Sequence, residues 1–175
     1  MNSIIYLGGG CFWCTESVFK KINGVISVTP GYMGGDNPNP IYEEVCEGNT
    51  NHVEVIKVEY DHSLSLYKIL SIFFSTHDPT SINRQGADVG TQYRSAVFCN
   101  QHERQFVIDF IKDLKAKGIF EDKIVTEVNN IVPFYEAEDY HHNYFTKNPQ
   151  NPYCLAVINP KLKKLRSNFS DLISK

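Results

Sequence analysis

The sequence predicts an α/β protein of the α+β kind, a split βαβ two-layer sandwich. Its mixed sheet is mostly antiparallel, and a long irregular C-terminal tail follows. Strand-like and helix-like segments follow one another in the order β-α-β-β-α-β before a third helix-like segment, and neither a linker nor an internal repeat divides the chain. The 175 residues, of which 42% are hydrophobic and 13% aromatic, suffice for one core. We therefore expect a single domain over residues 1–175.

The expected strands are short and rich in β-branched and aromatic residues, whereas the expected helices carry apolar residues three or four positions apart. These patterns predict strands at residues 3–7, 25–32, 53–60 and 94–99, and helices at residues 15–22, 64–74 and 101–117. Gly118 ends the third helix. From about residue 148, Pro149, Pro152 and Pro160 predict irregular structure that wraps the body, and the basic run at 161–166 is expected to be a solvated tail.

The nine residues from Gly8 to Glu16, GGGCFWCTE, join the first predicted strand to the first predicted helix. The glycines let the backbone turn tightly and leave space beside the sulfur of Cys11. Because Cys11 lies at or just before the helix start, unpaired N–H groups and the helix dipole favour an anion there. We therefore expect Cys11 to be a reactive thiol that ionises more readily than a free one.

Cys11 and Cys14 form a CxxC pair around the only tryptophan, a pattern that buried filler or half of a zinc site could also give. Zinc would need a second pair, but Cys46, Cys99 and Cys154 are isolated and no HxxxH exists. GGGC also lacks the phosphate-loop and dinucleotide-binding spacings, so we predict no metal and no organic cofactor. Five unevenly spaced cysteines favour a reducing compartment, and Cys46 and Cys99, in strand-like settings, are expected to be inert.

The segment VEVIKVEY at residues 53–60 alternates, so that Glu54 shares a face with Ile56, Val58 and Tyr60. A carboxyl group on an apolar face loses hydration, which raises its pKa and keeps it protonated near neutrality. Such a group can donate a proton to an oxygen. The pattern alone leaves open that Glu54 lies at the strand end and reaches solvent.

Charge and hydropathy exclude several classes of partner. The formal charge of −3 and a pI near 6.1 give no broad attraction for nucleic acid or an anionic membrane. The N-terminal residues lack a basic region followed by a long apolar stretch, and no later segment approaches a membrane span. We expect a cytoplasmic monomer without a nucleic-acid or membrane partner.

GCFW followed by Glu16 resembles the signature of the peptide methionine sulfoxide reductases of the A type. Other blocks resemble that family in its order: GYMGG at 31–35, IYEEVCEGNTNHVEVIKVEYD at 41–61, HDPT at 77–80, GTQYRSA at 90–96 and AEDYHHNY at 137–144. The resemblance covers nearly the whole chain and implies the same α/β architecture. Asn51 stands where we expect glycine, which suggests a left-handed backbone, and His142 stands where glutamine is usual.

The resemblance implies an enzyme that reduces the S epimer of methionine sulfoxide, free or in proteins, and so repairs oxidative damage. The thiolate of Cys11 would attack the sulfoxide sulfur and be left as sulfenic acid. Glu54 matches the family's catalytic glutamate and would protonate the oxygen, with help from Tyr42 and Tyr93. Asp88 matches a further site position, where it would hold water or a substrate N–H, although a turn aspartate is a competing interpretation.

Phe12 and Trp13 flank the nucleophile, and an aromatic wall could hold the small apolar methyl group of the substrate. His52, His141 and His142 are expected to be structural or to support residues that touch the substrate, because the helix terminus already favours the thiolate. A general dithiol–disulfide oxidoreductase, which needs only the CxxC pair, and a non-catalytic binding module with an aromatic contact remain as alternatives.

A second cysteine must reduce the sulfenic acid. Cys14 is close enough for a local disulfide, and Cys154 matches a resolving position of many family members, many of which carry glycine in place of Cys14. We expect Cys154 to act first, because a cysteine on the same helix could face away from Cys11, with Cys14 as competitor or second relay. Thioredoxin would then reduce the exposed disulfide.

Overall fold

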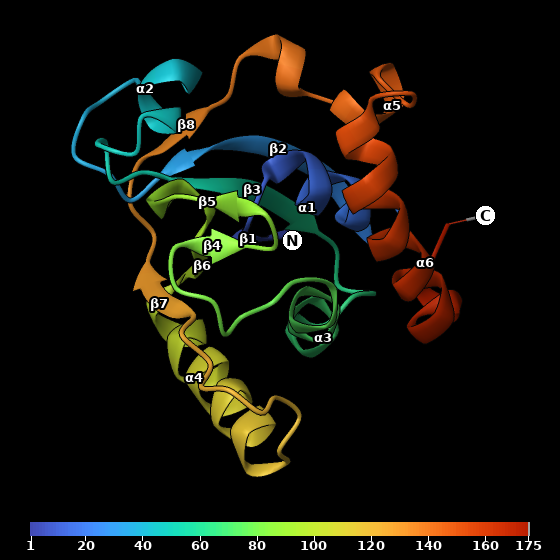
Figure 1. Ribbon diagram of the computed structural model, residues 1–175. Coiled ribbons are helices and arrows are strands. Elements are labelled where there is room, and N and C mark those ends of the chain that lie inside the picture. The colour runs from blue at the N-terminus through green and yellow to red at the C-terminus, as the bar shows by residue number, and fades with distance from the viewer. Residues whose placement is uncertain (175) are drawn as a thin grey trace.

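The computed structural model describes residues 1–174 and is built on a six-stranded sheet (Figure 1). Its strands are β1 (Ser3–Gly9), β2 (Val25–Met33), β3 (Val53–Tyr60), β6 (Ser95–Cys99), β7 (Glu127–Asn130) and β8 (Phe134–Glu136). They lie in the order β7-β6-β1-β3-β2-β8, and every neighbouring pair is antiparallel except β6 and β7. Since β3 lies between β1 and β2, which α1 connects, the predicted split βαβ arrangement is confirmed.

The helices are α1 (Phe12–Phe19), α2 (Tyr42–Cys46), α3 (Leu66–Thr76), α4 (Gln101–Ala116), α5 (Tyr144–Lys147) and α6 (Asn159–Asn168). Shorter elements are the hairpin of β4 (Arg84–Gln85) and β5 (Asp88–Val89), the 3₁₀ turns η1 (Thr91–Tyr93), η2 (Asp139–His141) and η4 (Ser170–Leu172), and the π-helical η3 (Cys154–Ile158). The three predicted helices exist, but α1 begins three residues earlier than its pattern suggested. None of the helices in residues 1–174 combines the length and the apolar character needed to span a bilayer.

Strand β3 is buried on both faces. Ile56 and Val58 belong to the main core, which also holds residues of α1, α3 and α6. On the other face, Val53 and Val55 pack in a second cluster with Phe98. The predicted alternation is therefore confirmed, and it fixes the face from which the glutamate of this strand projects.

The turn between β1 and α1 depends on glycine. A Cβ atom at Gly8 would lie 2.7 Å from Cγ1 of Val53, so the end of β1 could not approach β3 with a larger residue there. Gly10 has a φ of 94°, a conformation that side chains disfavour. Asn51 has a φ of 61°, which confirms the left-handed backbone predicted for it.

The C-terminal segment is helical, which corrects the prediction of irregular structure from about residue 148. Residues of η3 lead directly into α6, and Pro160 is the second residue of α6, just after this π-helical stretch. Leu162 and Leu165 are buried in the main core. Helix α6 thus packs across α1 and α3 (Figure 1), so the proline cluster marks a helix start in a segment that does cover the body.

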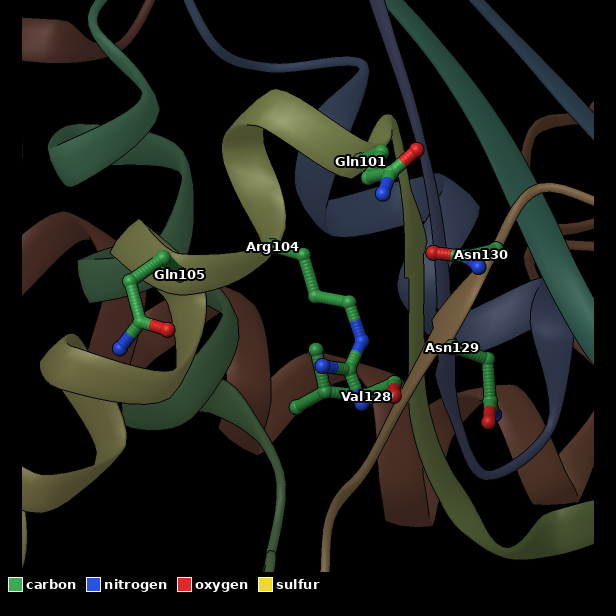
Figure 2. A pocket seen from close by; sticks show the side chains of 6 residues that line it. All are labelled: Gln101, Arg104, Gln105, Val128, Asn129 and Asn130. Carbon is green, nitrogen blue, oxygen red and sulfur yellow. Dashed lines mark hydrogen bonds between the residues drawn. The ribbon is translucent and has the colours of Figure 1, made fainter.

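A polar hollow of about 430 Å³ lies between α4 and β7 (Figure 2). In this hollow Arg104 reaches from α4 toward β7, and its Nη2 donates to the carbonyl of Val128 at 3.4 Å. The other lining residues are Gln101, Gln105, Asn129 and Asn130, none of which is a predicted site residue. In this hollow, the hydrogen bond of Arg104 therefore ties the edge strand β7 to α4.

Candidate active site

Cys11 is the N-cap residue of α1, as the sequence predicted. Its carbonyl accepts hydrogen bonds from the N–H groups of Cys14 and Thr15, at 3.0 and 3.4 Å, and so begins the helix. Cys11 is 9% exposed and Cys14 is 2% exposed. The first turn of α1 therefore presents two nearly buried thiols.

The predicted easy ionisation of Cys11 is wrong for this structure. Burial raises the pKa of Cys11 well above its ordinary value, and a hydrogen bond to Cys14 and the charge of Glu54 raise it further. The pKa of Cys14 is lowered instead, because the Cys11 thiol donates a hydrogen bond to the Cys14 sulfur. Of the two thiols, Cys14 is therefore the one that ionises more readily.

Glu54 is 1% exposed, so the possibility that it reaches solvent is excluded. Its Oε1 accepts a hydrogen bond from the N–H of Phe12 at 3.1 Å, which holds the carboxyl group beside the start of α1. Burial raises the pKa of Glu54 to about 8, although that N–H partly opposes the shift. The predicted protonated carboxyl is confirmed, and it lies next to the residue that follows Cys11.

Tyr42 and Tyr93 come from two different elements and both lie near Glu54. Tyr42 begins α2, and its N–H donates to Oε2 of Glu138 at 3.1 Å, while the Tyr32 hydroxyl donates to the other oxygen at 3.0 Å. Tyr93 ends η1. Burial raises the pKa of both Tyr42 and Tyr93, and the charge of Glu54 contributes to each shift. Both phenols therefore keep their protons as hydrogen-bond donors.

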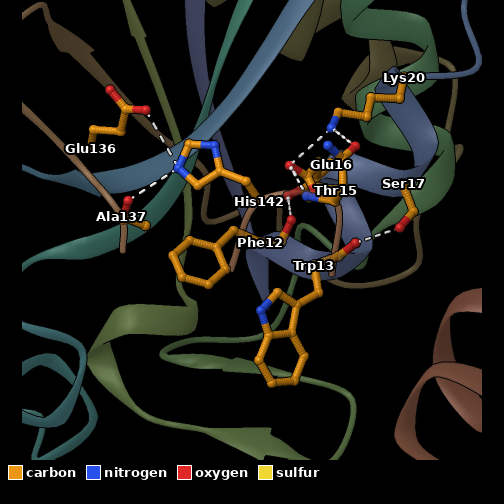
Figure 3. Close-up of polar contacts among 10 residues, drawn as sticks. Phe12, Trp13, Thr15, Glu16, Ser17, Lys20, Glu136, Ala137 and His142 are labelled. Atoms are coloured by element: carbon orange, nitrogen blue, oxygen red, sulfur yellow. Dashed lines mark hydrogen bonds and ion pairs between the residues drawn. The ribbon is translucent and has the colours of Figure 1, made fainter. Parts of the chain in front are cut away.

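Phe12 and Trp13 project from the first turn of α1 (Figure 3). The ring of Phe12 is fully buried and lies 4.9 Å from that of His141. Trp13 is half-buried, its Nε1 donates to Nδ1 of His141 at 2.9 Å, and its ring stacks on Tyr144 at 3.7 Å. The two rings are thus fixed in place, and His141 orients Trp13, which agrees with the supporting role expected of it.

The far side of α1 is tied to the segment after β8, as Figure 3 shows in part. Glu16, only 1% exposed, pairs with Lys20 at 3.3 Å and accepts the N–H of Asn143 at 3.2 Å. His142 contacts the carbonyl of Ala137 at 3.1 Å through Nε2. These contacts hold the η2 segment, and with it His141, against the start of the helix.

Asp88 lies on β5 and faces the thiols through a tyrosine that the sequence did not single out. Its Oδ2 accepts a hydrogen bond from the hydroxyl of Tyr153 at 2.5 Å, and the same hydroxyl lies 3.6 Å from Sγ of Cys14. A cavity of about 300 Å³ is lined by Cys11, Cys14, Asp88, Tyr153 and Lys161, among others. Lys161 was predicted to be part of a solvated tail, and this prediction is wrong.

Of the two cysteines expected to lie in strand-like settings, Cys99 does and Cys46 does not. Cys46 ends the helix α2 rather than lying in a strand, it is exposed, and it accepts a hydrogen bond from the Tyr42 hydroxyl. Cys99 is fully buried in β6. Cys154 begins η3, is fully buried, and lies near enough to Cys14 that the charge of Cys14 raises its pKa. All five cysteines are free thiols, and no cluster of three or more potential metal ligands occurs in residues 1–174.

Comparison with known proteins places this geometry in a family. The pattern of the family described as peptide methionine sulfoxide reductase matches residues 3–173. A protein of Trichodesmium erythraeum named peptide methionine sulfoxide reductase MsrA is 53% identical, over 99% of each chain. A protein of the same name from Psychrobacter cryohalolentis is 56% identical, over 97% of each chain. The crystal structure of reduced Mxr1 from Saccharomyces cerevisiae superposes with a TM-score of 0.78 at 35% identity, over 86% of this chain and 87% of that one. The chain therefore belongs to the peptide methionine sulfoxide reductase family.

Proposed function

We propose that Cys11 and Glu54 reduce the S epimer of methionine sulfoxide, with the thiol as nucleophile and the carboxylic acid as proton donor. The Cys11 sulfur attacks the sulfoxide sulfur, the Glu54 proton moves to the oxygen, and the oxygen passes to Cys11 as methionine leaves. Thiol plus sulfoxide becomes sulfenic acid plus thioether, so atoms and electrons balance. The observation that carries this proposal is the buried, protonated carboxyl group held 3.1 Å from the N–H of Phe12.

The raised pKa of Cys11 is compatible with this chemistry. A neutral thiol and a neutral carboxylic acid enter the site without the cost of a buried net charge. As Glu54 gives its proton to the sulfoxide oxygen, its carboxylate takes up the proton that the Cys11 thiol loses, and the site stays neutral overall. The proton transfer therefore takes over the role that we had expected of the helix terminus.

The other predicted residues would bind the sulfoxide group from different sides. Tyr42 and Tyr93 lie near enough to Glu54 that its charge raises the pKa of each, and their hydroxyls would donate hydrogen bonds to the oxygen. The fixed rings of Phe12 and Trp13 would hold the methyl group. Asp88 would accept the N–H of the substrate once Tyr153 moves aside. Fixed directions for methyl and oxygen would select one epimer at sulfur.

Recycling of the enzyme would use a disulfide. Cys14 and Cys154 are the two candidates to resolve the sulfenic acid, since both are buried near one another. Thioredoxin is proposed as the final reductant, because it exchanges thiols with accessible disulfides. The odd number of cysteines, all free, suits a monomer acting in a reducing cytoplasm.

The test is methionine formation from each epimer, coupled to thioredoxin, thioredoxin reductase and NADPH. We expect turnover of the S epimer only, complete loss in Cys11→Ser, and retention in the matched control Cys99→Ala, whose thiol lies in the core of β6. Equal turnover of both epimers, or activity in Cys11→Ser, would refute the proposal. Insulin disulfide reduction without methionine formation would favour a general dithiol oxidoreductase instead.

A further inference from the structure

The cavity beside the two thiols of α1 is closed by the C-terminal segment. Of its lining residues, Cys11 and Cys14 come from the start of α1, Asp88 from β5, and Tyr153 and Lys161 from the segment that runs through η3 into α6. The cavity has a volume of about 300 Å³, and the thiols of the two cysteines that line it are hydrogen-bonded to each other. Cys14 therefore does not face away from Cys11, which was the reason to expect Cys154 to resolve first.

Two polar groups of the C-terminal segment face Cys14 in this cavity. The Tyr153 hydroxyl lies 3.6 Å from Sγ of Cys14 and is oriented by its short bond to Asp88. The ammonium group of Lys161 lies near enough to Cys14 to lower its pKa, and it also faces Cys11 and Asp88. A cation stabilises a thiolate, whereas the hydroxyl, whose proton is donated to Asp88, fixes the position of the Cys14 sulfur.

The other titratable groups near Lys161 are Lys164 on α6 and His77 at the end of α3. His77 is buried and its pKa is lowered to about 4, so it is neutral near pH 7. Lys164 lowers the pKa of Lys161, as burial does, whereas both thiols of α1 raise it. The groups that raise the pKa of Lys161 are therefore the two thiols and the carboxylate of Asp88.

We propose that Lys161 and Tyr153 are positioning residues that prepare Cys14 to resolve the sulfenic acid on Cys11. The inference rests on the proposed function, since it needs a sulfenic acid at Cys11. It assigns the first disulfide to Cys11 and Cys14, and it gives Cys154 the later step of attacking that disulfide. The C-terminal helix thereby becomes part of the recycling machinery.

The step balances without an outside reagent. The Cys14 thiolate attacks Sγ of Cys11, the S–S bond forms, and the S–O bond of the sulfenic acid breaks. Lys161 gives a proton to the departing hydroxide, and it regains the proton that Cys14 lost. Thiol plus sulfenic acid thus becomes disulfide plus water.

The experiment follows a single turnover in a Cys154→Ser background, where Cys14 is the only candidate resolver. Enzyme is mixed with excess S-methionine sulfoxide between pH 6 and 9, and aliquots are quenched with dimedone. Mass spectrometry then measures released methionine, dimedone-labelled Cys11 and the disulfide between Cys11 and Cys14. The variants are Lys161→Met, Lys161→Arg and Tyr153→Phe, with Lys163→Met as the matched control on the exposed side of α6.

We expect Lys161→Met to slow disulfide formation at least about tenfold at pH 7, the loss of thiolate that a one-unit rise in pKa produces. The pH at which the rate is half-maximal should rise, and Lys161→Arg should restore both. Tyr153→Phe should slow the same step, and Lys163→Met should match the background.

Three results would overturn the inference: no disulfide between Cys11 and Cys14, an unchanged rate and pH profile in Lys161→Met, or an equal loss in Lys163→Met. A parallel slowing of methionine release in Lys161→Met would also overturn it, since the role would then be structural. Absence of methionine release in the background enzyme would instead refute the proposed function itself.

Discussion

Glu54→Gln should remove the proton donor. It should also make the protein more stable than wild type, by a margin that grows as pH rises. The carboxyl group has an ordinary pKa of 4.5 and a pKa of about 8 in the folded protein. Between these values the folded state binds more protons than the unfolded state, so the wild-type free energy of unfolding falls as pH rises. A neutral amide at position 54 does not titrate, and the stability of the variant should lack this loss.

The magnitude follows from the two pKa values. The cost of Glu54 to wild-type stability is below about 1 kcal/mol at pH 5, about 3 kcal/mol at pH 7 and about 4 kcal/mol at pH 8. Any fixed cost of the amide cancels when the two pH values are compared. Relative to wild type, the variant should therefore gain about 3 kcal/mol between pH 5 and pH 8, which is about 10 °C in Tm for a chain of this size.

The assay is thermal unfolding of wild type and Glu54→Gln across that pH range, together with the rate of methionine formation in one turnover. The rate should fall by about 10²–10⁴-fold, as loss of a general acid does. A Tm difference that stays constant from pH 5 to pH 8 would refute the reasoning, because it would mean that the carboxyl group keeps its ordinary pKa in the folded protein.

Other substitutions test how the site is held together. His141→Phe removes the 2.9 Å acceptor of the Trp13 indole, and we expect a red shift in the emission of this only tryptophan with about tenfold lower kcat/KM for the S epimer. Glu138→Gln weakens the hydrogen bond from the N–H of Tyr42, and kcat/KM should fall several-fold. The free energy of unfolding, measured by chemical denaturation, should fall by only about 1 kcal/mol. Leu162→Ala empties a buried position of α6, and denaturant unfolding should show a loss of about 2–5 kcal/mol. Unchanged emission, kinetics or unfolding in the respective variant would contradict each expectation.

The parts of the site that lie on one element could be predicted from sequence. The alternation of β3 fixed the buried side of Glu54, and the pattern GGGCFWCTE placed Cys11 at the start of a helix. Both inferences need only the local period of a strand or a helix. The positions of the four central strands along the chain followed in the same way from short segments of clear periodicity.

The parts that depend on distant contacts could not be predicted. Tyr153 and Cys14 are 139 positions apart, and no local pattern reports that they meet. Lys161 was taken for a solvated residue because a basic run is usually exposed, yet α6 turns this one residue toward the thiols. The helix-terminus argument for Cys11 was wrong for the same reason, since burial, which raises its pKa, arises only after packing.

Two short edge strands were also missed. The segment EVNN of β7 and the three residues of β8 lie at the two edges of the sheet, where one side of the strand has no partner. Edge strands need little hydrophobic pattern, so composition does not distinguish them from loops. The prolines after residue 148 led to a different error: they predicted irregular structure in a segment that is helical.

The transfer of oxygen to Cys11 is the central claim, and intact-protein mass spectrometry tests it most directly. A Cys14→Ser, Cys154→Ser double variant lacks both candidate resolvers, so the sulfenic acid should persist after one equivalent of S-methionine sulfoxide. We predict that the protein gains the mass of one oxygen atom on the peptide that contains Cys11, while one methionine per enzyme is released. Methionine release without this gain, or the oxygen found on Cys46 or Cys99, would contradict the account.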